Sequence, residues 1–72
     1  MAQPVESLLE MARRHVREGE HRVARLETII ADLERAGHAD SAGLGRTALA
    51  TVRTSLHEMK RHLRGIEARA KR

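Results

Sequence analysis

The chain has 72 residues and a formal net charge of +4, and it contains no cysteine and no Phe, Tyr or Trp. Its length allows one domain at most, and the absence of cysteine excludes a disulfide framework and thiolate metal sites. No apolar run approaches the ~20 residues of a membrane span, and the N-terminus lacks the apolar core of a secretory signal, so we expect a cytoplasmic protein without membrane association. The abundance of Ala, Leu, Arg and Glu predicts long helices rather than sheets.

The first predicted helix covers about residues 4–36. Pro4 suits its first turn, because the missing N–H would have no intrahelical acceptor there. From Val5 onwards, apolar or small residues recur at alternating steps of four and three, as in the seam of a coiled coil. With Leu9 at heptad position a, the a and d positions are Val5, Leu9, Ala12, Val16, Gly19, Val23, Leu26, Ile30 and Leu33.

A turn is expected at about residues 37–40. Gly37 follows the last periodic residue, where a left-handed C-terminal cap is common. Asp40 or Ser41 would cap the next helix. Because Gly43 and Gly45 weaken its start, the first ordered turn is left open between Asp40 and Thr47. A turn this short predicts antiparallel neighbours.

The second predicted helix covers about residues 41–70. Its seam consists of Leu49, Val52, Leu56, Met59, Leu63, Ile66 and Ala70, with Leu49 at position a. In an antiparallel pair, a residues pack against d residues, and this predicts that Gly19 faces Leu63 and Ile30 faces Val52. The glycine would leave room for the leucine.

The charges support the same alignment. Four pairs of residues with opposite charge have residue numbers that add up to the same sum. Two helices folded back on each other would place such residues opposite one another. All eight residues fall at position e. The pairs are Glu34 with Arg46, Glu27 with Arg53, Glu20 with Lys60, and Arg13 with Glu67. The sequence therefore predicts an all-α fold in which residues 1–72 form a single antiparallel two-helix coiled-coil hairpin.

Two helices cannot enclose a seam from all sides, so we expect the hairpin to dimerise into a four-helix bundle. The residues opposite Val5, Leu8 and Leu9 would have numbers beyond 72, so this apolar end should overhang the second helix. The g positions are also far less charged than the e positions. The expected homodimer interface is Val5, Leu8, Leu9, His15, Ile29, Ala36 and Ala48. The predicted function is that of a non-enzymatic, self-associating protein that acts through protein–protein contact.

Five histidines invite a metal hypothesis. Glu18 and His21 have the Glu-x-x-His spacing of helical di-metal proteins, but they fall at positions c and f, away from the core. We therefore predict no metal, no cofactor and no catalytic residue. His15 and His62 both fall at position g, and burial there would make a dimer sensitive to pH.

Nucleic-acid binding is the alternative function. The second half of the chain is strongly basic, and its free cations could contact phosphates. The lack of aromatic residues disfavours recognition of single strands, which relies on stacking. The candidate contacts are Arg61, Arg64, Arg69, Lys71 and Arg72.

Several short stretches carry a family resemblance. Residues 14–20 read Arg-His-Val-Arg-Glu-Gly-Glu, residues 22–25 read Arg-Val-Ala-Arg, and Ala36-Gly37-His38 follows later. Together, over roughly residues 13–66, they resemble a family of small bacterial helical proteins with the pattern RHVxEGExRVxR and a Gly-His turn. The resemblance implies a helical hairpin of bacterial origin, but no activity is assigned to the family, so it implies no functional residue. Residues 39–45 depart from the family pattern by being longer and richer in glycine.

Overall fold

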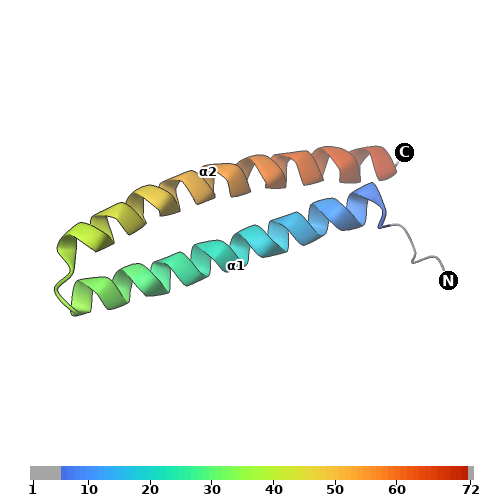
Figure 1. Ribbon diagram of the computed structural model, residues 1–72. Coiled ribbons are helices and arrows are strands. Elements are labelled where there is room, and N and C mark those ends of the chain that lie inside the picture. Colours follow the sequence, from blue (N-terminus) through green and yellow to red (C-terminus); the bar gives the residue numbers. More distant parts are fainter. Residues whose placement is uncertain (1–5, 72) are drawn as a thin grey trace.

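The computed structural model describes residues 6–71. They form two helices, α1 (Leu8–Arg35) and α2 (Ala39–Ala70), which run antiparallel and lie side by side (Figure 1). The hairpin measures 51 × 32 × 13 Å, and its radius of gyration is 16.5 Å, whereas a compact domain of this length would have about 11 Å. The predicted all-α hairpin is confirmed, and it is an elongated one.

The start of α1 differs from the prediction. Ser7 is the N-cap: its side-chain oxygen accepts a hydrogen bond from the Glu10 N–H at 3.0 Å, and its hydroxyl donates to Glu10 Oε1 at 3.0 Å. Ser7-x-x-Glu10 is the spacing of a capping box, which stops a helix from extending further back. The helix therefore begins at Leu8 rather than near residue 4. The predicted first-turn residue Pro4, and Val5, lie outside the described residues.

The turn has the geometry that the sequence predicts. Gly37 has a φ of 80°, in the left-handed region that residues with a Cβ rarely adopt. The Gly37 N–H donates to the Glu34 carbonyl at 3.1 Å, and the His38 N–H donates to the Leu33 carbonyl at 2.9 Å. These two bonds form a Schellman motif, which satisfies carbonyls at the end of α1 and reverses the chain.

The start of α2 is earlier than expected. The N-cap is His38, which makes no side-chain capping bond, and not Asp40 or Ser41. Gly43 and Gly45 both lie within the helix. A Cβ on Gly45 would stand 2.8 Å from Ile30 Cγ1. This glycine therefore permits a close approach of α1, and the resulting packing offsets its weak helix propensity.

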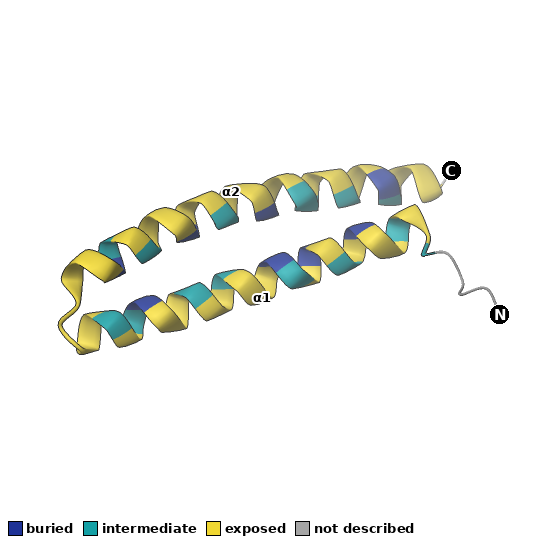
Figure 2. Cartoon of the chain, in the orientation of Figure 1, coloured by how far each residue is buried: buried dark blue, intermediate teal, exposed yellow. Residues whose placement is uncertain are grey.

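The core is the strip between the facing sides of the two helices (Figure 2). Its buried residues are Ala12, Val16, Gly19, Ile30, Ala42, Leu49, Leu56 and Ile66. One detail of the predicted pairing is wrong. The atoms nearest to the place of a Gly19 Cβ belong to Leu56 and Met59, not to Leu63. Each seam residue sits in a hole formed by several residues of the facing helix, so a list of single pairs does not describe the packing.

This core is thin. Ala42 has no exposed surface, yet no large side chain within residues 6–71 is fully buried. Half of the seam stays partly open to solvent, namely Leu9, Val23, Leu26, Leu33, Val52, Met59 and Leu63. The seam between the two helices is therefore incompletely covered.

Candidate interaction surface

One long edge of the hairpin is closed by ion pairs. All four predicted pairs are present: Glu34 with Arg46 at 3.6 Å, Glu27 with Arg53 at 3.5 Å, Glu20 with Lys60 at 3.9 Å, and Arg13 with Glu67 at 3.5 Å. We call these eight residues the charged edge. Exposed pairs of this kind contribute only ~0.2–1 kcal/mol each, so their main effect is to disfavour other alignments of the helices.

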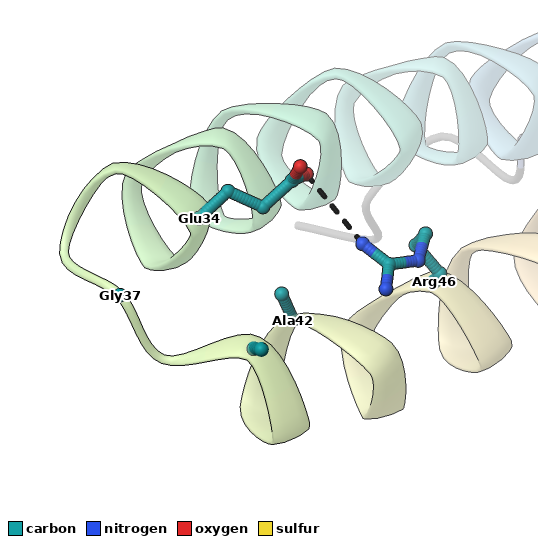
Figure 3. A pocket seen from close by; sticks show the side chains of 5 residues that line it. Glu34, Gly37, Ala42 and Arg46 are labelled. Atoms are coloured by element: carbon teal, nitrogen blue, oxygen red, sulfur yellow. Dashed lines mark ion pairs between the residues drawn. The ribbon is translucent and has the colours of Figure 1, made fainter.

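The charged edge begins at a hollow beside the turn. Glu34, Gly37, Ala39, Ala42 and Arg46 line this hollow, and Figure 3 shows the Glu34 carboxylate and the Arg46 guanidinium directed at each other across it. The acid and the base neutralise each other here. The pair therefore contributes to the alignment of the two helices near the turn, and the hollow carries no excess of either charge.

The exposed apolar residues lie on the opposite edge. The exposed fractions are 62% for Leu8, 37% for Met11, 43% for Ile29 and 75% for Leu44. Leu8 and Ile29 are at heptad position g, whereas Met11 and Leu44 are at position c, which is next to g around a helix. We call these four residues the apolar edge. Sequence reasoning missed Met11 and Leu44 because it examined the g positions and the N-terminal overhang but not the c positions.

The middle of the apolar edge is hollowed. A shallow apolar depression there is lined by Leu26, Ile29 and Val52, with Arg22 and Arg25 at its border. Leu26 and Val52 are half-buried seam residues from the two helices. The depression thus connects the exposed edge with the incompletely covered core, and its cationic border carries no acidic residue.

The structure places most of the predicted interface residues on accessible surface. Leu8, His15, Ile29, Ala36 and Ala48 are exposed, Leu9 is half-buried, and Val5 lies outside the described residues. The expected overhang is not seen over the described range, because the start of α1 and the end of α2 lie side by side at the open end (Figure 1). The later start of α1 removes it.

A second set of polar contacts holds Glu6, which precedes α1. Arg14 Nε donates to Glu6 Oε2 at 3.1 Å, Arg14 Nη2 donates to Glu6 Oε1 at 2.9 Å, and Arg14 Nη1 donates to Glu18 Oε1 at 2.9 Å. Hydrogen bonds from Arg14 lower the pKa of the Glu6 carboxyl and that of Glu18, while the two acids raise the pKa of Arg14. This clamp was not predicted from the sequence.

The clamp also bears on the metal hypothesis. Glu18 is engaged by Arg14, and His21 is exposed on the outer face of α1. Within residues 6–71, no three His, Asp, Glu or Cys side chains come together in a way that could hold a metal ion. In the same range, neither helix is long and apolar enough to cross a membrane.

The predicted basic residues do not form one patch. Arg61, Arg64, Arg69 and Lys71 are all exposed, and Arg72 lies outside the described residues. Five residues of an α-helix correspond to a rotation of about 140°, so Arg69 lies on a different side of α2 from Arg64. The structure therefore separates Arg69 from the other three cations.

Comparison with known proteins found no match. No protein-family model, no curated protein and no solved structure matches the chain. The resemblance of residues 13–66 to bacterial helical-hairpin proteins stays a prediction, and the function proposed next depends on the geometry described above.

Proposed function

We propose that this protein is a non-enzymatic helical module that self-associates through its apolar edge and acts by protein–protein contact. The observation that carries this proposal is the position of four large apolar residues that are exposed within residues 6–71. Leu8, Met11, Ile29 and Leu44 lie on the edge opposite the ion pairs. Scattered exposed aliphatic residues need no explanation, but Ile29 borders an apolar depression that reaches the half-buried Leu26 and Val52, and this arrangement is typical of an association surface.

The exposed area is large enough to support a dimer. The chain exposes 5868 Å² for a mass of 8.1 kDa, whereas a compact monomer of this mass would expose about 4,500 Å². A stable protein–protein interface buries about 800 Å² on each partner. Burial of that area in a dimer would remove a little more than half of the excess exposed surface.

A second copy is the occupant that fits the apolar edge. Two hairpins supply the four helices that enclose a common core, and a twofold axis lets the same patch serve on both copies. With that axis along the hairpin, α1 of one copy lies beside α2 of the other. Arg25 and Glu58 both occupy position c, at similar heights on the two helices, and they would then meet with opposite charge.

The test is a pair of lysine substitutions at neighbouring positions of α1. Ile29→Lys places a third cation beside Arg22 and Arg25 and removes an aliphatic side chain from the depression. Thr28→Lys adds the same charge on the outer face. Sedimentation equilibrium at micromolar concentration is expected to give twice the 8.1 kDa chain mass for the wild type and for Thr28→Lys, and the single mass for Ile29→Lys.

Circular dichroism on the same samples separates association from folding. If the wild-type chain is fully helical at the mass of a single chain across the concentration range, self-association is excluded. The proposal would also be contradicted if both lysine variants sedimented at the mass of a single chain, because the effect would then come from the added charge and not from the apolar edge.

A further inference from the structure

The basic residues near the end of α2 remain unexplained by self-association. Ion pairs engage Arg46, Arg53 and Lys60 with acids of α1, whereas Arg61, Arg64 and Lys71 make no ion pair with another residue in the described range. All three are exposed. The excess positive charge of the chain is therefore concentrated partly on this segment, and it is available to an anionic partner.

These three cations form a stripe. Steps of three and seven residues along an α-helix correspond to rotations of about −60° and −20°, so Arg61, Arg64 and Lys71 face nearly the same way over a length of about 15 Å. We call these three residues the basic stripe. His57 lies seven residues before Arg64 and continues the same face toward the turn.

The surroundings of the basic stripe identify the class of partner. The other residues on this face are Thr54 and Ala68. Two acids border it: Glu67 pairs with Arg13, and Glu58 lies three residues before Arg61 on the side toward the apolar edge. The large exposed aliphatic residues lie on the apolar edge. A protein interface has an apolar core, and a membrane-surface helix inserts apolar side chains, but a phosphate backbone requires only correctly spaced cations. Because the chain has no aromatic residue on which bases could stack, a duplex fits better than a single strand.

We infer that the basic stripe binds the phosphate backbone of duplex nucleic acid without reading its sequence. The stripe occupies positions b and f of α2, whereas the apolar edge occupies positions c and g. A dimer formed through the apolar edge leaves the stripe of each copy exposed, so the two surfaces can act together. The binding does not depend on the proposed self-association.

Fluorescence anisotropy with a labelled duplex, titrated at several salt concentrations, tests the inference. Three phosphate contacts predict a slope of about −2.7 for log K against log salt, so that binding weakens about 40-fold when the salt concentration rises fourfold. In the double variant Arg61→Gln/Arg64→Gln, the slope is expected to become shallower, at about −0.9. Binding at low salt is expected to weaken by at least about tenfold.

The matched control is Arg35→Gln/Arg46→Gln, which removes the same charge at the turn end of the hairpin, far from the basic stripe. It is expected to bind the duplex within about twofold of the wild type, because loss of distant exposed charge alone leaves the phosphate contacts in place. Circular dichroism verifies that both double variants are folded, and sedimentation verifies that their association state is unchanged.

Three results would overturn the inference. The first is the absence of duplex binding at low salt, and the second is equal weakening in both double variants. The third is tighter binding to single strands or to vesicles of anionic phospholipid than to the duplex. That result would assign the basic stripe to another partner.

Discussion

Gly45 shows how one absent side chain sets the distance between the two helices. A Cβ at this position would lie 2.8 Å from Cγ1 of Ile30, which is a buried and β-branched residue with few alternative rotamers. Gly43, in the same turn of α2, would bring its Cβ no closer than 3.9 Å to the end of the Arg46 side chain. The two glycines therefore have different roles.

Alanine substitutions at these two positions should change stability in opposite directions. Gly45→Ala is expected to destabilise the fold by about 1–3 kcal/mol, because Ile30 and the backbone must move to accept the methyl group. Gly43→Ala is the control, and it is expected to stabilise by about 0.5–1 kcal/mol through helix propensity. Thermal or urea unfolding measures both values. A Gly45→Ala protein as stable as Gly43→Ala would contradict the close packing of α1 on α2.

The Arg14 clamp is the other residue-scale feature. A carboxyl whose pKa is lowered by folding contributes stability above its ordinary pKa, and this stability is lost as the pH falls through the lowered value. The pKa values of the Glu6 and Glu18 carboxyls are lowered in this way by hydrogen bonds from Arg14. Glu6 should therefore remain bound to Arg14 at neutral pH and be released in acid.

An NMR titration of the Glu6 side-chain carboxyl tests the clamp. Its pKa is expected below the ordinary value of 4.5 because Arg14 donates hydrogen bonds to the charged form. Arg14→Gln should return the pKa to the ordinary value. Arg17→Gln is the control, and it should leave most of the shift in place, because Arg17 acts on Glu6 only through its charge. Titration of wild-type Glu6 at 4.5 or above would show that the clamp does not form in solution.

At the scale of the helices, the charged edge determines how α1 and α2 align. Glu27 and Arg53 lie 3.5 Å apart in the middle of the ladder, and both are more than half exposed. Shifting α2 by one helical turn would separate all four pairs at once, so the ladder favours a single alignment although each pair contributes little.

A double-mutant cycle with Glu27→Gln and Arg53→Gln should measure this contribution. We expect a coupling free energy of ~0.2–1 kcal/mol in unfolding experiments, which decreases as salt is added. The matched cycle combines Glu27→Gln with Arg46→Gln, whose side chain pairs with Glu34 instead, and it should give a coupling near zero. Equal coupling in the two cycles would mean that general charge, not the paired alignment, is responsible.

The features that the sequence predicted are those set by periodicity alone. The ladder pairs follow once two helices are antiparallel, and the left-handed Gly37 follows from the end of the seam. The structure differs where local chemistry competes with periodicity. The seam continues to Val5, but the Ser7 cap begins α1 at Leu8. The low helix propensity of Gly45 predicts a later start of α2, but Gly45 lies within the helix, where it packs closely against Ile30. The contact between Glu6 and Arg14 depends on the backbone conformation just before α1, and the heptad pattern does not predict that conformation.

At the scale of the whole molecule, the hairpin has two unlike long edges. The charged edge has its ionic groups matched within one chain, whereas the apolar edge borders a depression that reaches the half-buried Leu26 and Val52. A protein whose core lacks a fully buried large side chain over residues 6–71 gains most from an additional layer on that side. The proposed self-association through the apolar edge would supply that layer.

Isotope-filtered NMR on a mixture of labelled and unlabelled chains tests this central claim most directly, because it detects only contacts between copies. We expect intermolecular signals from the methyl groups of Leu8, Ile29 and Leu44, and none from Thr28 on the outer face of α1. Intermolecular signals confined to the charged edge, or none at concentrations where the chain is folded, would contradict the assignment of the apolar edge as the association surface.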